Sequence, residues 1–148
     1  GLIAHQTSIP WNDRSGDRLR DWLGITKEQF YDEKVMTILP MSFCYPGRGK
    51  AGDNPPVKVC APLWHKKLLG VTKPKLTLLV GKHAQDYYLT DTLSLTQRLK
   101  NWQAYLPQHL VLPHPSPRNN IWLKKNPWFE SEVVPQIKTL LSDQSLFL

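Results

Sequence analysis

Short apolar runs alternate with helical patterns along this chain, and that alternation restricts its fold more than any other feature. Leu76 to Val80 and Leu110 to Leu112 are apolar runs of strand length, and each leads through a turn into a helical pattern. Strands that alternate with helices pair in parallel, because the helix carries the chain back to the starting end of the sheet. The pattern predicts an α/β fold, a three-layer αβα sandwich with a mainly parallel central sheet.

The other expected elements follow from apolar periodicity and turn residues. Helical segments are expected at residues 15–24, 27–33, 62–69, 82–89, 94–105 and 127–141, with a shorter pattern around Trp122. Ser15 is the expected N-cap of the first helix, and Gly24 is the residue expected to end it. A further strand is expected from Val35 to Leu39, whereas the glycines and prolines of residues 41–59 favour a long loop without regular structure.

The composition indicates one packed domain, expected to span residues 1–148. Of the 148 residues, 41% are hydrophobic and six are Trp, which is enough for a sizeable core. Lys and Arg number 19 against 12 Asp and Glu, and the net charge of +7 favours a polyanionic partner. No apolar run approaches the roughly 20 residues that span a bilayer. We therefore expect a cytoplasmic protein without a membrane segment, acting as a monomer.

A stiff, cationic loop follows the second apolar run, at residues 114–120. Its two prolines fix the backbone before any ligand binds, which lowers the ordering cost of binding. His114 can donate a hydrogen bond to a carbonyl or an anion, and Ser116 and Arg118 can bind phosphate oxygens. Ligands of parallel sheets bind beyond the carboxyl ends of the strands, so this loop is a candidate site. The alternative is an ordinary proline-rich turn with a solvated histidine.

Two cysteines, Cys44 and Cys60, are too few for a disulfide framework. Neither belongs to a Cys-x-x-Cys pair, so they do not make a complete tetrahedral thiolate site by themselves. They are either free thiols or part of a larger ligand set.

Three segments resemble the uracil-DNA glycosylase superfamily, and the closest resemblance is to its iron-sulfur branch. The first runs from Gly1 through Leu23 and includes the Pro-Trp-Asn-Asp-Arg-Ser-Gly sequence of residues 10–16. The second covers residues 38–84, and the third, His-Pro-Ser-Pro at residues 114–117, is similar to the second catalytic motif of the family. Only Gly1 could correspond to the family's first motif, so this sequence is expected to lack that motif and the strand before it.

The resemblance implies a glycosylase that flips uracil or a related damaged base out of DNA and hydrolyses its N-glycosidic bond. His114 would donate to the base carbonyl that gains negative charge, and Trp11 would stack on the flipped base. Ser116 would hold a phosphate, while Arg118 and Asn119 would enter the minor groove. On this resemblance, Pro115 and Pro117 would belong to the same DNA-binding loop. Alternatively, Trp11 is a core aromatic and Arg118 a solvated cation.

The resemblance also implies roles for four residues outside that loop. Asp13 would activate or orient the attacking water, and Asn12 would read the base where Pro40 replaces an asparagine of several family members. Both could instead be turn residues before the first long helix. Cys44 and Cys60 would join two upstream cysteines around a 4Fe-4S cluster.

Two other function classes compete with a glycosylase. A binding module could keep the fold and the basic surface without catalysis, and it would bind DNA in a salt-sensitive way without releasing a base. An unrelated hydrolase or nucleotide enzyme is disfavoured, because the sequence has no Gly-x-Ser-x-Gly, His-Glu-x-x-His or complete phosphate-loop motif. Residues 46–50 resemble a phosphate loop only superficially and are better explained as a mobile basic loop near DNA or near the cluster.

Overall fold

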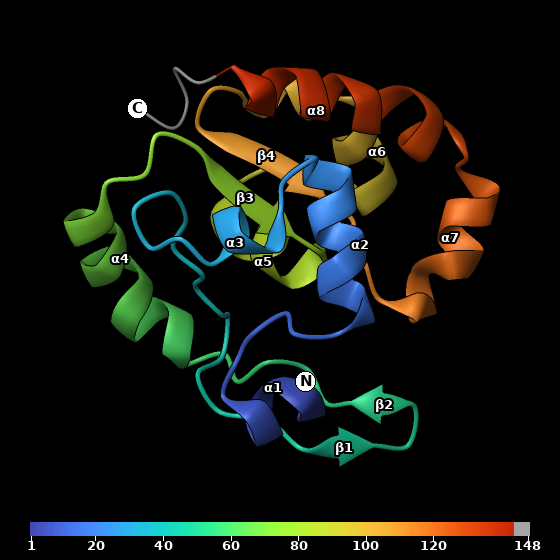
Figure 1. Cartoon of the computed structure of the whole chain (residues 1–148). Helices are drawn as coiled ribbons and strands as arrows, with labels where there is room; N and C mark the ends of the chain where they lie inside the picture. The colour runs from blue at the N-terminus through green and yellow to red at the C-terminus, as the bar shows by residue number, and fades with distance from the viewer. Residues whose placement is uncertain (144–148) are drawn as a thin grey trace.

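The computed structural model describes residues 1–143 and has a mixed α/β architecture (Figure 1). The last five residues of the expected domain, 144–148, lie outside the described residues. The helices are α1 Leu2–Thr7, α2 Arg14–Leu23, α3 Lys27–Phe30, α4 Cys60–Thr72, α5 Lys82–Tyr88, α6 Leu95–Lys100, α7 Asn120–Lys125 and α8 Val134–Ser142. The strands are β1 Arg48–Gly49, β2 Gly52–Asp53, β3 Thr77–Val80 and β4 His109–Leu112.

The two apolar runs form β3 and β4, which confirms both strand predictions. They pair in parallel, with Thr77 opposite His109 and Val80 opposite Leu112. Both strands therefore end at the same edge of the sheet, which has two strands within the described residues. The order strand, helix, strand is thus correctly predicted in this half of the chain.

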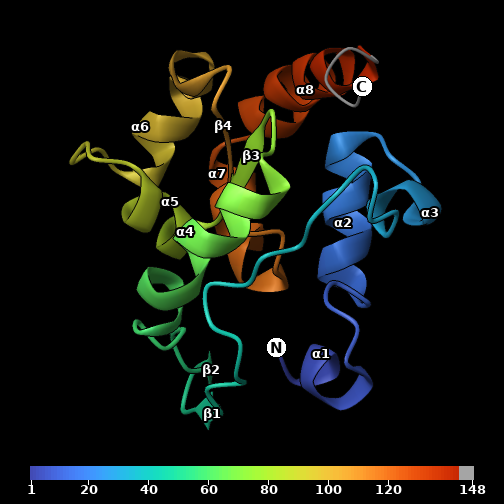
Figure 2. The same cartoon turned by 90° about the vertical axis from the view of Figure 1, so that its left-hand side faces the viewer.

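Helices lie on both sides of these two strands (Figure 2). One side carries α4, α5 and α6, and the other carries α2, α3 and α8. The core between them is built from the strands and the inner faces of the helices. Its most buried members include Trp22, Leu79, Leu99, Leu110, Leu112, Phe129 and Ile137. No described helix is long and apolar enough to cross a bilayer.

The predicted strand from Val35 to Leu39 is wrong. The amides of Val35 and Met36 both donate to the Asp32 carbonyl, at 2.9 Å each, and this turn uses the donors that a strand ladder would need. Met36 and Ile38 still pack against the core. The apolar, β-forming residues of this segment therefore indicate packing against the core, but no strand within residues 1–143 pairs with them.

The predicted absence of regular structure in residues 41–59 is also wrong. Arg48–Gly49 and Gly52–Asp53 form a short antiparallel hairpin, with Arg48 opposite Asp53. Gly52 has φ 120°, a conformation that side chains rarely adopt. The glycines that suggested irregularity are what allow this tight turn.

Several helix boundaries differ from the prediction. Asp13, not Ser15, caps α2, although Gly24 ends it as expected, with φ 67°. The helix predicted at 62–69 extends over Cys60–Thr72, and α1 was not predicted. The helix predicted at 94–105 splits into α6 and a 3-10 turn at Trp102–Tyr105. The one predicted at 127–141 begins as a π-helical turn, Phe129–Val133, before α8.

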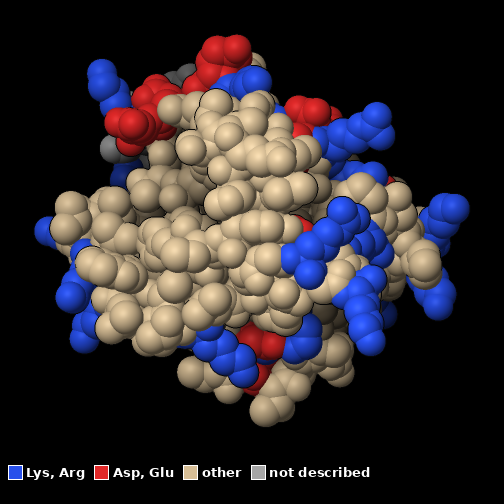
Figure 3. All heavy atoms as spheres, turned by 90° about the horizontal axis from the view of Figure 1, so that it is seen from below, with Lys and Arg blue, Asp and Glu red and all other residues tan. Residues whose placement is uncertain are grey.

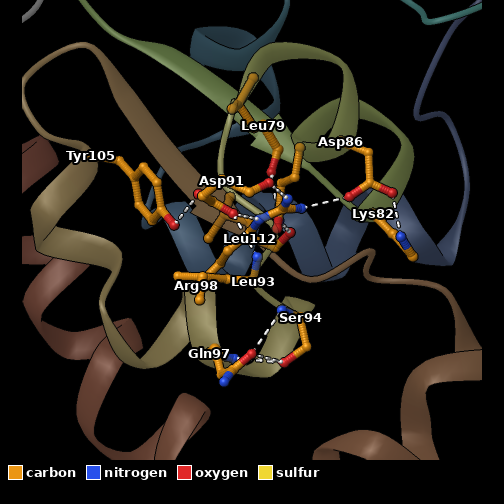
Figure 4. A network of polar contacts seen from close by, with 11 residues as sticks. Leu79, Lys82, Asp86, Asp91, Leu93, Ser94, Gln97, Arg98, Tyr105 and Leu112 are labelled. Atoms are coloured by element: carbon orange, nitrogen blue, oxygen red, sulfur yellow. Dashed lines mark hydrogen bonds and ion pairs between the residues drawn. The ribbon is translucent and has the colours of Figure 1, made fainter.

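A buried arginine joins the helices on one side of the strands (Figure 4). Arg98 of α6 is 2% exposed and donates to Asp86 of α5 at 2.7 Å and to Asp91 at 2.9 Å. The Tyr105 hydroxyl donates to Asp91 at 2.7 Å, and burial raises the pKa of Tyr105 to about 12. Hydrogen bonds from Lys82 and Arg98 lower the pKa of Asp86. This network fixes α5 and α6 behind the ends of β3 and β4.

Candidate active site

The turn after β3 passes close to His114, which lies two residues beyond the end of β4. The Gly81 amide donates to the Leu112 carbonyl at 2.9 Å, and a Cβ at residue 81 would lie 3.1 Å from the Cβ of His114. Gly81 also has φ 84°, so a larger residue would be strained here as well as crowded. Below them, the buried Gln85 amide donates to the carbonyls of Leu79 and Leu112 at 3.3 and 2.9 Å. These hydrogen bonds hold the ends of β3 and β4 together, just before His114.

One nitrogen of the His114 ring has a defined partner. The backbone N–H of Ser116 donates to Nδ1 at 3.2 Å. A backbone amide can only donate, so Nδ1 acts as the acceptor and Nε2 carries the proton of the neutral ring. His114 is exposed, and its Nε2–H can therefore serve as a donor to a ligand.

The surroundings of His114 favour the neutral ring. Desolvation by nearby protein atoms is the largest cause that lowers its pKa, and the positive charges of Arg118 and His83 lower it further. The negative charge of Asp13 acts in the opposite direction. Although the side chain is exposed, the protein around it restricts its solvation. The result is an accessible, uncharged donor near neutral pH.

Trp11 lies against this histidine. The two ring centroids are 5.4 Å apart, and the ring planes are tilted by 34°. Trp11 is half-buried and packs on the edge of the core. The alternatives of a core aromatic and a ligand-facing aromatic are therefore not exclusive, because this ring reaches from the core to His114.

Asn12 and Asp13 both have structural partners. Asp13 Oδ1 accepts from the Gly16 amide at 2.9 Å and caps α2, while Asn12 Oδ1 accepts from Lys27 Nζ at 3.3 Å. Asp13 is nevertheless close enough to His114 to affect its charge state. The negative charge of Asp13 thus acts on His114, whereas Asn12 is tied to α3.

Internal hydrogen bonds hold the loop after His114. The side chain of Asn119 donates to the His114 carbonyl at 2.7 Å, and Ser116 Oγ accepts from the Arg118 amide at 3.3 Å. Arg18 of α2 donates to the Pro115 carbonyl at 3.4 Å. Pro115 is buried, whereas Pro117 is exposed and starts the 3-10 turn Pro117–Asn119. The predicted stiff loop is therefore present, and Asn119 helps to shape it.

Arg118 reaches from this loop to the β1–β2 hairpin. A Cβ at residue 52 would overlap the Arg118 guanidinium, so Gly52 provides the space in which that group lies. Arg118 itself is exposed, as are Arg48 and Lys50 of the hairpin. Two basic segments far apart in the sequence thus lie side by side.

The comparison with known families agrees with this geometry. The sequence model described as the uracil DNA glycosylase superfamily matches residues 1–138, which is most of the chain. The chain belongs to the uracil DNA glycosylase superfamily. Membership points to DNA as the substrate and to glycosylase chemistry, and it confirms the resemblance inferred from the sequence at the level of the superfamily.

The charge distribution suits the DNA substrate of a uracil DNA glycosylase superfamily member. Figure 3 shows the lower face of the molecule, with Lys and Arg along its left and right margins. Asp and Glu gather at the top edge and in one small group near the bottom. Exposed cations spread around such a face can supply the sequence-independent part of DNA binding.

The two cysteines do not by themselves complete the cluster site implied by the iron-sulfur branch of the superfamily. Cys44 is exposed, Cys60 begins α4, and both are free thiols. No group of three or more His, Cys, Asp or Glu in residues 1–143 is placed to hold a metal ion. A 4Fe-4S cluster takes four thiolates, so the residues present do not fit it alone.

Sequence reasoning missed a buried contact between α4 and the segment at Pro40. His65 is buried in α4, where Nε2 donates to the Pro40 carbonyl at 2.9 Å and Nδ1 accepts from the Tyr88 hydroxyl at 2.6 Å. Burial raises the pKa of Tyr88 to about 12, which keeps that hydroxyl a donor. The sequence signal that could have indicated this contact is a single histidine among the apolar residues of α4. Pro40 thus contributes its carbonyl to a structural contact.

Proposed function

We propose that this protein is a DNA glycosylase that hydrolyses the N-glycosidic bond of uracil or a related damaged base. The observation that carries the proposal is the state of His114, an exposed and neutral ring whose proton is placed on Nε2 by the Ser116 amide. Membership of the superfamily supports the reaction class. The base must first be flipped out of the duplex, because stacking hides the reacting atoms.

Cleavage of the glycosidic bond leaves its electron pair on the base, and negative charge develops on the neighbouring carbonyl oxygen. His114 Nε2–H would donate to that oxygen and stabilise the departing base. Trp11, whose ring already lies beside His114, would stack on the flipped base. Water attacks the sugar carbon, and Asp13 is the candidate to orient it or to take its proton. Asn12 would offer its amide hydrogens to the base edge, since its oxygen is engaged by Lys27.

The loop after His114 would hold the DNA around the flipped nucleotide. Ser116 would bind a phosphate, and Arg118 and Asn119 would fill the gap from the minor groove. Pro115 and Pro117 would keep this loop stiff. The hairpin beside Arg118 adds Arg48 and Lys50 to the same surface.

The finer classification is part of this proposal. We propose the three-layer αβα sandwich for the fold and a monomeric protein of the iron-sulfur branch. Cys44 and Cys60 would supply two of the four cluster ligands. No catalytic step described above depends on the cluster.

The glycosylase proposal is tested by base release from a duplex oligonucleotide with one uracil. Alkali cleaves the strand at an abasic site, so product on a denaturing gel measures release. The matched control is the same duplex with thymine in place of uracil. Parallel duplexes with hypoxanthine or mismatched thymine determine the preferred base. DNA binding without release from any of these substrates would favour the non-catalytic binding module instead.

Uracil release is expected to rise with pH and to level off above about pH 6.5, the ordinary value for histidine. The folded environment lowers the pKa of His114, so the neutral donor is lost only as the pH falls through that lower value. The profile of kcat/KM reports this ionisation in the free enzyme. A rate that falls as the pH rises through this range would instead require the imidazolium.

The same shift predicts the pH dependence of stability. When the pKa of a histidine is lower in the folded than in the unfolded state, the free energy of unfolding is highest above the unfolded-state pKa. It decreases as the pH falls through the folded-state pKa, because the folded protein binds that proton less readily. Burial also lowers the pKa of His109, which therefore contributes to the same decrease in stability. The difference in unfolding free energy between wild type and His114→Gln across this pH range measures the part due to His114.

Arg118→Gln is expected to weaken binding to all duplexes and to lower the slope of log affinity against log salt concentration by about 1. The reason is the loss of one cation from the proposed DNA surface. Fluorescence anisotropy between 50 and 200 mM salt measures the slope over roughly the range in which such contacts dominate. Lys73→Gln is the matched control, because Lys73 is exposed at the far end of α4. Equal slopes for wild type and Arg118→Gln would show that Arg118 does not contact the DNA phosphates.

A further inference from the structure

The backbone of Trp11 is held in an unusual conformation. Its φ of 61° lies in the left-handed region, which bulky residues rarely adopt. The other non-glycine residues with positive φ in the described chain, Ser8 and Lys73, end helices α1 and α4, where this conformation is common. Trp11 ends no helix. Its conformation therefore needs another cause.

Two side chains bind the consecutive carbonyls of Pro10 and Trp11. Arg20 Nη1 donates to the Trp11 carbonyl at 3.1 Å, and the Tyr31 hydroxyl donates to the Pro10 carbonyl at 2.7 Å. Arg20 lies on α2, and Tyr31 directly follows α3. The segment before α2 is thus attached at two neighbouring points to the helices that come after it.

The arginine of this pair is itself rigidly placed. Arg20 is 6% exposed, its Nη2 lies 2.7 Å from the Asp17 carboxylate, and its guanidinium lies 5.2 Å from the Phe30 ring centroid. A buried arginine with a carboxylate partner and an aromatic neighbour has few alternative positions. It therefore acts as a fixed donor to Trp11.

The start of α2 completes this arrangement. A Cβ at residue 16 would overlap the carbonyl of Trp11, so only glycine lets the helix approach so closely. The Trp11 carbonyl thus lies against Gly16 and accepts from Arg20, both of α2, and the Trp11 ring lies 5.4 Å from the His114 ring. Contacts to the backbone of Trp11 thus determine where its side chain lies.

We propose that Arg20 and Tyr31 are positioning residues that hold the Trp11 backbone in its left-handed conformation and so place its ring against His114. The effect on catalysis rests on the proposed function, because it requires Trp11 to contact the flipped base. The placement of the Trp11 ring does not depend on that function. Ring placement and catalysis are therefore tested in separate experiments.

Ring placement is tested by NMR on the DNA-free protein. The Trp11 ring, 5.4 Å from the His114 ring, changes the NMR chemical shifts of the His114 ring protons. The Trp11→Ala variant gives the chemical shifts of these protons without the indole ring. Tyr31→Phe removes one hydroxyl and keeps the ring that packs on Phe30 at 5.1 Å. We expect this variant to move the His114 signals toward those of Trp11→Ala. Tyr105→Phe, which loses an equivalent 2.7 Å bond to Asp91, is the matched control and should leave them unchanged.

The catalytic effect is tested by a double-mutant cycle. Tyr31→Phe is expected to lower kcat/KM about fivefold, the equivalent of one typical hydrogen bond, and to have no further effect in a Trp11→Ala background. Arg20→Lys, which keeps the charge and can still reach the carbonyl, should lose less activity than Arg20→Met. A residue that only supports the fold would lower activity by the same factor in both backgrounds.

The proposal is overturned if Tyr31→Phe leaves the His114 signals at their wild-type positions while Trp11→Ala moves them. It is also overturned if Trp11→Ala moves nothing, because the two rings would then not be in contact. Shifted signals together with no base release by the wild-type protein would support the positioning role and reject the proposed glycosylase activity. The two failures are thus distinguishable.

Discussion

His114→Ala is expected to lower the rate of uracil release by about a hundredfold to a thousandfold, the usual effect of removing one donor that stabilises developing charge. The protein should remain folded. The ring is exposed, and the Ser116 amide that donates to it is at the surface and can bind water instead. Single-turnover rates with excess protein measure the chemical step, and thermal unfolding measures the fold.

His114→Gln is the matched variant for this experiment. Glutamine carries an amide N–H donor but cannot titrate, so it should retain more activity than alanine and lose the pH dependence below about pH 6.5. An alanine variant that releases uracil at the wild-type rate would show that His114 is not the donor. A variant that loses activity and unfolds would show a structural role, in conflict with the exposed position of the ring.

The sequence predicts the elements whose signals are local. The runs at β3 and β4, the glycine at the end of α2 and the stiff loop after His114 all follow from short stretches of residues. The strand expected from Val35 to Leu39 fails because its amides are used by the turn at Asp32. That competition depends on a side-chain and backbone arrangement that apolar periodicity does not report.

The site is predicted in part for the same reason. His114 and its loop are recognisable from prolines, charge and position after a strand. The contact of Trp11 with His114 joins residues 103 positions apart by subtraction, and it depends on a left-handed backbone at Trp11 and on glycines at residues 16 and 81. Only the spatial arrangement shows why these glycines are needed. Arg20 is a charged residue within the helix expected at residues 15–24, yet it is buried and binds the Trp11 carbonyl.

Asp13 has a structural role and a proposed catalytic role. Its Oδ1 caps α2 through the Gly16 amide, and its charge acts on His114. A cap explains an aspartate, an asparagine or a serine equally well, because all three accept from the first turn of a helix. Only a catalytic or electrostatic role requires the negative charge. The two roles can therefore be separated by one substitution.

Asp13→Asn is expected to keep the cap and to lower uracil release by about a hundredfold or more, the range for loss of a general base. The unfolding free energy should change little, whereas Asp13→Ala should lower it by about 1 kcal/mol because the cap is lost. Asp13→Asn should also move the low-pH inflection of kcat/KM to lower pH, because the Asp13 charge raises the pKa of His114.

The contrast between these two variants decides the role of Asp13. Wild-type release by Asp13→Asn together with a destabilised Asp13→Ala would make the residue a helix cap only, and the water would then have to be oriented by another group. Lost release with an unmoved inflection would assign Asp13 to the water and not to His114. Lost release with a shifted inflection would mean that the carboxylate acts on both, which is the result expected here because the Asp13 charge raises the pKa of His114.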